Sequence, residues 1–363
     1  MKICFLAGAN SVHSHRWIRY FVNKGYEIYW ISLMPSIEPF SETISFYDIG
    51  PLSTNPIDVF IQVLKARQLI KKIKPNLLHI HSAGTYGLIG VLSGFHPFIV
   101  TTWGSDVLIR GQSLIKRPII RFVLKKSDLI TCDADHMINA MSKLGIDSKK
   151  MKLIYFGVEP DKFKPGLKDK NLLAKWDVGD SPTVISLRNL EPVYDIETLI
   201  KSIPLVLEKI PETKFIIAGI GSQEEHLKRL AESLRVINSI RFVGRYSHLE
   251  LPNYLSSTDV YVSTSLSDAG IAASTAEAMA SNLPVIVTDS GENRKWIKDG
   301  ENGFVIPIKN PKILAEKIIY LFEHDEIRKK ISENGREIIN EKNNYYKEMG
   351  KMEEIYEEII KNS

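Results

Sequence analysis

Cysteine is scarce in this chain, and no apolar run is long enough to cross a membrane. The 363 residues include two cysteines, Cys4 and Cys132, which form no CxxC pair and cannot build a disulfide framework. So few cysteines are typical of a reducing, cytoplasmic compartment. A membrane-spanning helix needs about 18 to 20 apolar residues in succession, whereas the run at residues 3–7 is soon followed by His13 and Arg16. That run predicts a buried first strand and not a signal peptide.

Net charge is also low. The 47 Lys and Arg against 43 Asp and Glu leave a formal charge of +4 at pH 7, whereas nucleic-acid binders usually carry a concentrated basic face. We therefore expect no nucleic-acid partner, although a local basic patch is compatible with this charge. With 44% hydrophobic and 25% charged residues, disordered, collagen-like and coiled-coil chains are excluded. At about 150 residues per domain, the length predicts two domains.

Short apolar runs alternate with segments of helical periodicity, in two series. Candidate strands of the first series lie at residues 3–6, 27–32, 77–81, 98–102, 129–132 and 152–155. Those of the second series lie at residues 183–187, 214–218, 240–243, 260–263, 285–288 and 303–306. Helical patterns lie between them, at residues 17–24, 59–72, 195–209, 224–234, 248–255 and 274–280. The alternation predicts an α/β fold of two Rossmann-like, doubly wound domains.

A polar stretch at residues 159–180, with several Pro, Gly and Lys residues, separates the two series. It indicates a linker, so we place the domains at residues 1–165 and 166–340, with a helix at 341–363. Ligands of doubly wound sheets bind at the carboxyl ends of the strands. A central cleft between two such domains is therefore the expected site.

The most informative segment runs from Ser263 to Thr288. A strand end is followed by a loop of small residues around Gly270 and by a helix that begins at about residues 272–274. Free N–H groups and the helix dipole at that point suit a diphosphate. Glu277, one turn into the helix, could accept hydrogen bonds from sugar hydroxyls. Taken alone, Glu277 is better explained as a glutamate that stabilises the helix dipole.

This segment resembles the nucleotide-sugar signature of the retaining family-4 glycosyltransferases, which have the two-domain GT-B fold. The match lies in the sequence EAMA at 277–280 and PVI at 284–286. The resemblance implies that Glu277 binds the donor ribose. The family's first glutamate, which contacts the donor sugar, falls on Ala269, and we expect the preceding Asp268 to substitute for it.

A second matching segment is SLRNLEP at residues 186–192. In the family, an arginine and a lysine six residues later hold the leaving diphosphate. Arg188 matches the arginine and Glu191 a nearby acid, but Tyr194 stands at the lysine position. We expect the helix N-terminus, Arg245 or a basic residue of the first domain to supply the missing charge. Arg188 alone could instead form a surface salt bridge worth ~0 to 1 kcal/mol, but its place after a strand favours a functional role.

Further donor-side residues follow from the same resemblance. The loop at 218–222 contains Gly221, and Arg245 follows the next strand. Gly219-x-Gly221 alone is weak, because it lacks the third glycine of a dinucleotide fingerprint. We assign donor binding to Glu277, Glu191, Gly270, Ile271, Gly221, Arg245 and, after the first strand, Gly8.

In the first domain, His81 ends a predicted strand at the position where the family carries a cleft histidine. The alternative is a hydrogen-bonded structural histidine. We assign catalysis to Arg188, His81 and Asp268, and the acceptor side to His15, Trp103 and Asp106. The Trp103 indole can stack on a sugar face or pack in the core, and Asp106 could instead be a helix N-cap.

Two other signals are less specific. Asp133 and Asp135 imitate an Asp-x-Asp metal motif, but capping of the following helix explains them better. We expect no metal, since no set of ligand residues has a metal-binding spacing. The tract at residues 110–126 alternates basic and apolar residues. It could contact an anionic membrane surface, or its apolar side could face the core.

The resemblance implies a retaining, hexosyl-type glycosyltransferase that moves a sugar from a nucleotide-diphosphate sugar to a glycan or lipid-linked acceptor, in cell-surface polysaccharide or glycoconjugate assembly. It also implies that the helix at 341–363 packs back on the first domain. We expect the protein in the cytoplasm or at the inner face of the plasma membrane. The alternatives are a sugar-nucleotide epimerase or hydrolase of the same fold, and a degenerate nucleotide-binding protein without activity.

Overall fold

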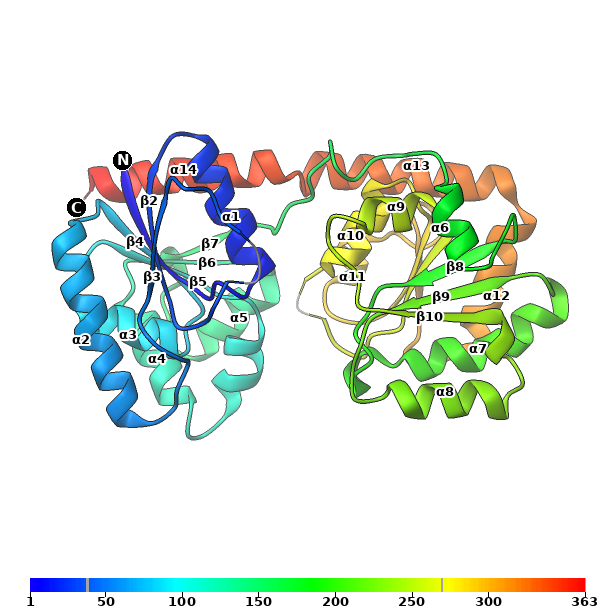
Figure 1. The fold of residues 1–363 in the computed structure, drawn as a ribbon, viewed down its shortest axis with the longest axis horizontal. Helices are drawn as coiled ribbons and strands as arrows, with labels where there is room; N and C mark the ends of the chain where they lie inside the picture. Colours follow the sequence, from blue (N-terminus) through cyan, green and yellow to red (C-terminus); the bar gives the residue numbers. More distant parts are fainter. Residues whose placement is uncertain (37–38, 269, 363) are drawn as a thin grey trace. The chain divides into compact units, whose positions relative to one another are not determined.

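The computed structural model describes residues 1–36, 39–268 and 270–362. The chain forms two compact units (Figure 1). Unit 1 comprises Met1–Tyr155 and Lys347–Ser363, and unit 2 comprises Phe156–Tyr346. The boundary between the units, after Tyr155, precedes the linker predicted at residues 159–180, because the linker residues hydrogen-bond to the rest of unit 2. The Asp169 N–H, for example, donates to the Ser257 hydroxyl at 2.9 Å.

Unit 1 is built on a parallel sheet with the strand order β3-β2-β1-β4-β5-β6-β7. The strands are β1 Lys2–Leu6, β2 Glu27–Ser32, β3 Ile44–Asp48, β4 Leu77–His81, β5 Phe98–Thr101, β6 Leu129–Cys132 and β7 Met151–Leu153. The sequence did not predict β3. It is an edge strand with no fully buried residue, so it lacks the apolar run of a central strand.

Helices cover both faces of this sheet. They are α1 Val12–Asn23, α2 Pro56–Ile73, α3 Thr85–Ser93, α4 Arg117–Lys126, α5 Asp135–Lys143 and α14 Tyr345–Lys361. The helices α1 and α14 lie on one face, and α2, α3 and α4 lie on the other (Figure 1). This division follows from right-handed crossovers, because the chain moves one way along the sheet through α1 and the opposite way through α2, α3 and α4.

The C-terminal helix α14 supplies part of the core of unit 1. Tyr356 is fully buried, stacks on Phe21 of α1 at a ring distance of 4.6 Å, and hydrogen-bonds through its hydroxyl to His79 Nδ1. Glu353 accepts hydrogen bonds from the hydroxyls of Tyr20 and Tyr26 at 3.2 and 2.7 Å. Residues at opposite ends of the sequence therefore form one folded unit.

Unit 2 contains a second parallel sheet, with the strand order β10-β9-β8-β11-β12-β13. Its strands are β8 Thr183–Ser186, β9 Lys214–Ala218, β10 Ile240–Gly244, β11 Val260–Ser263, β12 Val285–Thr288 and β13 Phe304–Ile306. Its helices are α6 Lys170–Lys175, α7 Ile196–Lys209, α8 Glu224–Ser233, α9 Leu251–Ser256, α10 Ala273–Ala280, α11 Asn293–Trp296, α12 Pro311–Glu323 and α13 Asp325–Lys342. The helices α7 and α12 pack together, as do α10 and α13.

The predicted strands are confirmed. Those at residues 27–32, 77–81, 129–132, 214–218, 260–263 and 285–288 have the predicted bounds, and the others end within two residues of them. Apolar runs identified them because both faces of each sheet are covered: the three apolar residues of β12, at 285–287, have no exposed surface.

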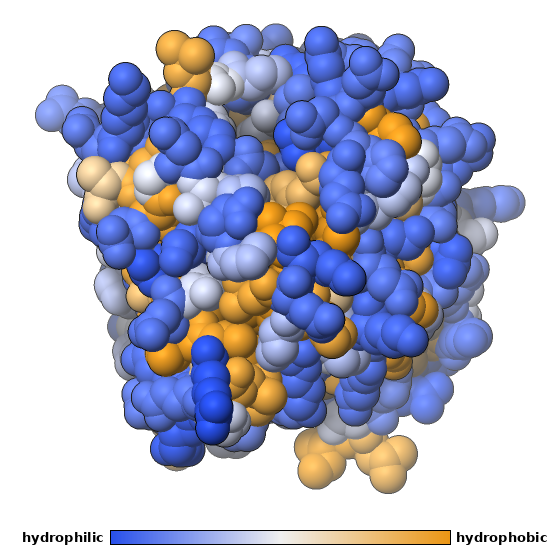
Figure 2. Space-filling model, turned by 90° about the vertical axis from the view of Figure 1, so that its right-hand side faces the viewer, coloured by the Kyte–Doolittle hydropathy of each residue, from blue (hydrophilic) through white to orange (hydrophobic). Residues whose placement is uncertain are grey.

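The surface has the mixed character expected of a folded chain. Hydrophilic residues dominate the face drawn in Figure 2, and hydrophobic residues are exposed in patches between them. Within the described part of the chain, no helix is both long and apolar enough to span a membrane.

Candidate functional site

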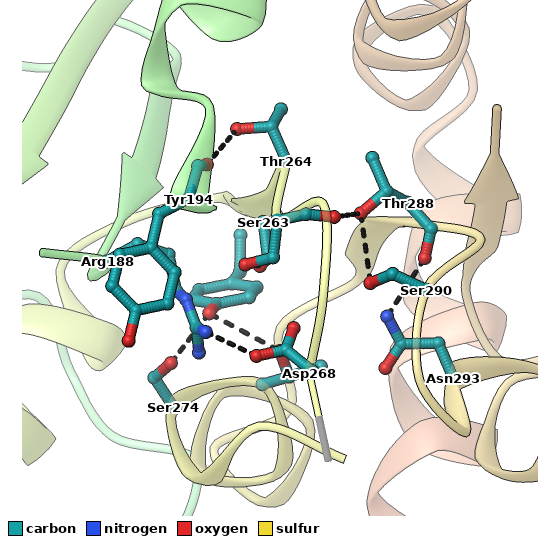
Figure 3. A network of polar contacts seen from close by, with 12 residues as sticks. Arg188, Tyr194, Ser263, Thr264, Asp268, Ser274, Thr288, Ser290 and Asn293 are labelled. Carbon is teal, nitrogen blue, oxygen red and sulfur yellow. Dashed lines mark hydrogen bonds and ion pairs between the residues drawn. The ribbon is translucent and has the colours of Figure 1, made fainter. Parts of the chain in front are cut away.

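Arg188 lies at the centre of a buried polar network at the carboxyl edge of the unit 2 sheet (Figure 3). Its Nη2 atom is 2.5 Å from Oδ1 of Asp268, and both side chains are only 10% exposed. The ring centroid of Tyr194 lies 4.4 Å from the guanidinium carbon. The cation is therefore held between a carboxylate and an aromatic face.

This ion pair leaves hydrogen-bonding capacity unused. Nε of Arg188 and Oδ2 of Asp268 are both buried and have no hydrogen-bond partner among the described residues. Burial raises the pKa of the Asp268 carboxyl, and the Arg188 charge opposes that rise. Since buried polar groups are normally satisfied, these two atoms mark a place where a polar ligand could bind.

The backbone around Arg188 is fixed by loops from neighbouring strands. The Leu266 N–H donates to the Val193 carbonyl at 2.8 Å, and the Thr264 hydroxyl donates to the Tyr194 carbonyl at 3.0 Å. These bonds tie the segment after β8 to the segment after β11. Tyr194 and Asp268 thus reach Arg188 from two loops that are hydrogen-bonded to each other.

Glu191 joins the loop after β8 to the loop after β9. Its carboxylate accepts hydrogen bonds from the N–H and the hydroxyl of Ser222 at 2.9 and 2.6 Å. A Cβ at Gly221 would collide with the Leu190 carbonyl, and a Cβ at Gly219 would lie 2.5 Å from the Arg188 carbonyl. In the structure, these glycines permit close packing of the two loops, which is a structural reason for their presence.

Glu277 is buried, 4% exposed, in α10. Its Oε1 is 3.2 Å from Nε2 of His248, whose Nδ1 is 2.6 Å from the Lys162 ammonium. An ammonium group can only donate, so Nδ1 accepts and Nε2 carries the proton that is donated to Glu277. Sequence reasoning did not assign His248 or Lys162 to the site, since both lie in segments far from Glu277 along the chain.

The start of α10 is available for an anion. The N-cap residue Ala272 provides no side-chain cap, so the first N–H groups of the helix are not satisfied by a side chain. Gly270 is buried and Ile271 is half-buried directly before it. The hydroxyl of Ser274 hydrogen-bonds to that of Tyr261 at 2.8 Å. Ala269, where the family's first glutamate falls, lies outside the described residues.

Two further features of unit 2 lie apart from this network. Arg245 is exposed, and no described residue forms an ion pair with it. A pocket of about 640 Å³ is lined by Glu191, Asp195, Lys201, Lys309 and neighbouring residues. It has lining charges of both signs and does not include Arg188, Asp268 or Glu277, so it does not define the site.

In unit 1, His81 lies at the carboxyl end of β4 and is 3% exposed. Its Nδ1 atom is 3.1 Å from the Ser14 hydroxyl, whereas its Nε2 atom is buried without a partner in the described chain. Burial, with a smaller effect of His13, lowers the pKa of His81 to about 3. The ring is therefore neutral at physiological pH and is a weak base.

The predicted acceptor-side residues have different environments. Trp103 is half-buried and stacks on His13 at 5.2 Å, with its edge toward His81 at 5.4 Å. His15 is buried, and its Nε2–H donates to the Ala9 carbonyl at 2.8 Å. The three residues Trp103, His13 and His81 thus form one aromatic cluster, whereas His15 fastens the loop before α1.

Asp106 has the hydrogen bonds of a structural residue. It is 2% exposed and accepts from the N–H groups of Ala83, Trp103 and Val107 at 3.0 to 3.2 Å. These contacts position the loop after β5. The N-cap alternative is wrong in detail, because the N-cap of the short helix Ser105–Ile109 is Gly104 and Asp106 lies in its first turn. Burial raises the pKa of the Asp106 carboxyl, and the backbone hydrogen bonds oppose that rise.

The capping interpretation of the Asp-x-Asp sequence is wrong in detail. The N-cap of α5 is Ala134, which has no capping side chain, and Asp135 lies in the first turn. A carboxylate there is favourable for the helix dipole. Among the described residues, no group of three His, Cys, Asp or Glu is placed to hold a metal.

Comparison with known proteins now identifies the class. The family "Glycosyl transferases group 1" matches residues 168–338, and "Glycosyl transferase 4-like" matches residues 2–134. N-acetyl-alpha-D-glucosaminyl L-malate synthase of Bacillus anthracis is 22% identical over 93% of this chain and 91% of its own length.

Solved structures share the fold. A glycosyltransferase from Rickettsia africae superposes with a TM-score of 0.84 at 21% identity, covering 100% of this chain and 99% of that one. HepE of Anabaena, solved in complex with UDP, superposes with a TM-score of 0.84 at 17% identity, covering 99% and 100%. Each unit is a parallel-sheet α/β domain of the GT-B type. The chain belongs to the group 1 glycosyltransferases.

Proposed function

We propose that this glycosyltransferase uses a nucleoside-diphosphate sugar as donor and transfers the sugar to a glycan or lipid-linked acceptor with retention of the anomeric configuration. The observation that carries the proposal is Arg188, a buried cation beside the uncapped start of α10 at the carboxyl edge of the sheet. That edge is where doubly wound sheets bind ligands. HepE, a structural relative, binds UDP, which supports a nucleotide donor here.

In this mechanism the donor diphosphate takes the place of Asp268 on Arg188. Charge develops on the diphosphate as the sugar leaves, and the guanidinium and the N–H groups of α10 stabilise it without reorganisation. Asp268, released from the ion pair, accepts a hydrogen bond from a sugar hydroxyl. Glu277, oriented by His248, accepts hydrogen bonds from the ribose.

Retention follows if the acceptor attacks from the side of the leaving group, with a phosphate oxygen taking its proton. Glu277 is held by the His248 imidazole, and Asp268 is assigned to a sugar hydroxyl, so neither carboxylate is assigned the role of a nucleophile. We further propose a role in cell-surface polysaccharide or glycoconjugate assembly, on the cytoplasmic side of the plasma membrane, with residues 110–126 in contact with the lipid. No metal is assigned a role.

The test is nucleotide release from a panel of UDP-, GDP- and ADP-sugars, with and without a lipid extract. Acceptor-dependent release supports transfer, acceptor-independent turnover supports an epimerase or hydrolase, and binding without turnover supports a degenerate protein. Proton NMR of the product reports the anomeric configuration.

Variants make the test specific. Arg188→Ala and Glu277→Gln should each lower kcat/KM by about 100-fold, the scale seen when one electrostatic contact is lost. Arg294→Ala is the matched control, since Arg294 forms an exposed ion pair with Asp289 in the same unit. Unchanged transfer by both site variants would show that the site is elsewhere.

A further inference from the structure

Basic charge is concentrated in one part of unit 1. Residues 56–126 contain 11 Lys and Arg but only Asp58 and Asp106 as acids, although the whole chain carries only +4. All 11 basic residues are exposed, whereas Asp106 is buried. None of the 11 forms an ion pair with a described residue. Acidic side chains of the described chain therefore do not neutralise this charge.

The same region exposes apolar side chains in a regular pattern. Ile57, Phe60, Ile61 and Leu64 of α2 are 69%, 62%, 44% and 48% exposed. Their spacing of i, i+3, i+4 and i+7 places them on one face of the helix. Residues such as Val63 and Ile70 on the opposite face are buried against the unit. The helix α2 thus has a second apolar face with no partner in the described chain.

A second apolar group precedes and enters α4. Leu114 and Ile115 are 87% and 84% exposed, and Ile119 and Phe122 are each 40% exposed. One of the two alternatives for residues 110–126 was that the apolar side of the tract faces the core. Ile120, Val123 and Leu124 do so, but these four side chains do not.

Both groups lie on the same face of the unit 1 sheet. The helix α3 packs against α2 on one side and α4 on the other, and Figure 1 shows all three on the same side of the strands. Crossover helices run antiparallel to the strands they join, so their N-terminal halves lie toward the carboxyl edge of the sheet. The exposed residues at 57–64 and 114–122 lie in, or directly before, those halves.

A basic pocket lies beside them. It has a volume of about 420 Å³ and is lined by Arg117, Pro118, Arg121, Lys143, Leu144 and Gly145. Three of these side chains are cationic and none is acidic. Nε of Arg121 donates to the Leu144 carbonyl at 2.8 Å, which orients the rest of the guanidinium. A planar guanidinium fixed in this way suits a phosphate group.

We propose that this face of unit 1, formed by α2, α4 and the loop before α4, docks on an anionic lipid bilayer and takes a lipid phosphate into the Arg117–Arg121–Lys143 pocket. Exposed apolar side chains among unpaired cations are the pattern of interfacial membrane binding. The inference extends the contact proposed above from residues 110–126 to α2 and the pocket. The carboxyl edge of unit 1, with His81 and Trp103, would then lie close to the lipid surface.

The experiment is co-sedimentation of the full chain with vesicles of phosphatidylcholine alone or mixed with phosphatidylglycerol, without donor or acceptor. The protein should bind only the anionic vesicles, and less at high salt. At about 1 kcal/mol per basic residue near the surface, Arg117→Ala/Arg121→Ala/Lys143→Ala should lower the partition coefficient by about 100-fold. Leu114→Ser/Ile115→Ser should lower it by about 100-fold, since burial of each apolar side chain in the bilayer surface contributes about tenfold.

Matched controls lie on unit 2. Lys209→Ala/Lys312→Ala/Lys330→Ala removes the same charge from exposed positions, and Leu167→Ser changes an apolar side chain that is 94% exposed. Both should bind vesicles as the unchanged protein does. Thermal melts check that every variant folds.

Several outcomes would overturn the inference. They are equal binding to neutral vesicles, no binding to either, or an equal loss in the controls. Displacement by inorganic phosphate with no effect of Leu114→Ser/Ile115→Ser would indicate a small-anion site. Equal binding to heparin would indicate a polyanion surface. Because no sugar is transferred in this assay, its failure would overturn the membrane contact proposed above and here, but not the proposed glycosyl transfer, which the nucleotide-release assay tests separately.

Discussion

Tyr194 offers the sharpest test of how the donor site works. It stands where the family resemblance implies a lysine, and its ring lies 4.4 Å from the guanidinium carbon of Arg188. We expect the ring to hold Arg188 in position for a diphosphate, so that Tyr194→Ala weakens binding without removing any formal charge. A cation over an aromatic ring contributes about 1 to 2 kcal/mol when partly desolvated. The dissociation constant should therefore rise about 5- to 30-fold.

The assay is isothermal titration calorimetry with UDP, GDP and ADP, using whichever nucleotide binds the unchanged protein. Tyr194→Phe is the matched control, because it keeps the ring and no described residue hydrogen-bonds to the Tyr194 hydroxyl. Tyr194→Lys separates the contribution of the aromatic ring from that of a positive charge, since it removes the ring and adds a charge beside Arg188.

Two results would refute the reasoning about Tyr194. One is a dissociation constant for Tyr194→Ala equal to that of the unchanged protein. The other is an equal loss in Tyr194→Phe, which would show that the hydroxyl and not the ring is important. Circular dichroism must show an intact fold for either result to count.

Three further outcomes concern stability. Asp268→Ala should destabilise unit 2 by about 3 kcal/mol in urea, because it leaves Arg188 buried without its partner, and Asp268→Leu/Arg188→Met should restore most of the loss. Gly291→Ala should destabilise unit 2 by about 1 to 3 kcal/mol and weaken nucleotide binding, since its φ is +56° and a Cβ would collide with the Asp268 carbonyl. Gly179→Ala, with φ of +55° and no neighbour within 4 Å, should have the smaller effect. Equal effects of the two substitutions would show that a collision with Asp268 is not the cause of the destabilisation. Burial lowers the pKa of His81 to about 3, so below pH 6.5 the unfolded chain binds a proton at His81 that the folded chain does not. The contribution of His81 to the free energy of unfolding therefore falls by about 1.4 kcal/mol per pH unit as the pH drops toward 3. Hydrogen-exchange protection factors, which correct for the slower intrinsic exchange of amides in acid, should therefore fall on acidification more in β4 peptides than in β12 peptides. An equal fall would contradict this assignment.

Much of the fold could be predicted because strands buried on both faces carry continuous apolar runs. The same rule explains the strand that was missed, since β3 at the sheet edge has no such run. The donor segment could be located from its motifs, but the roles of individual residues could not. Glu191 matches a family acid, and only the structure shows that it binds Ser222.

By itself, the sequence determined the two-domain α/β class, the glycosyltransferase resemblance and the positions of Arg188 and Glu277, because these depend on local periodicity and on motifs read along the chain. The tertiary structure decided which side chains meet. It brought Asp268 to Arg188 from 80 residues away and His248 to Glu277 from 29 residues away. It also left one face of α2 uncovered. Such pairings depend on which loops the strand order places side by side, and no short-range pattern in the chain encodes that order.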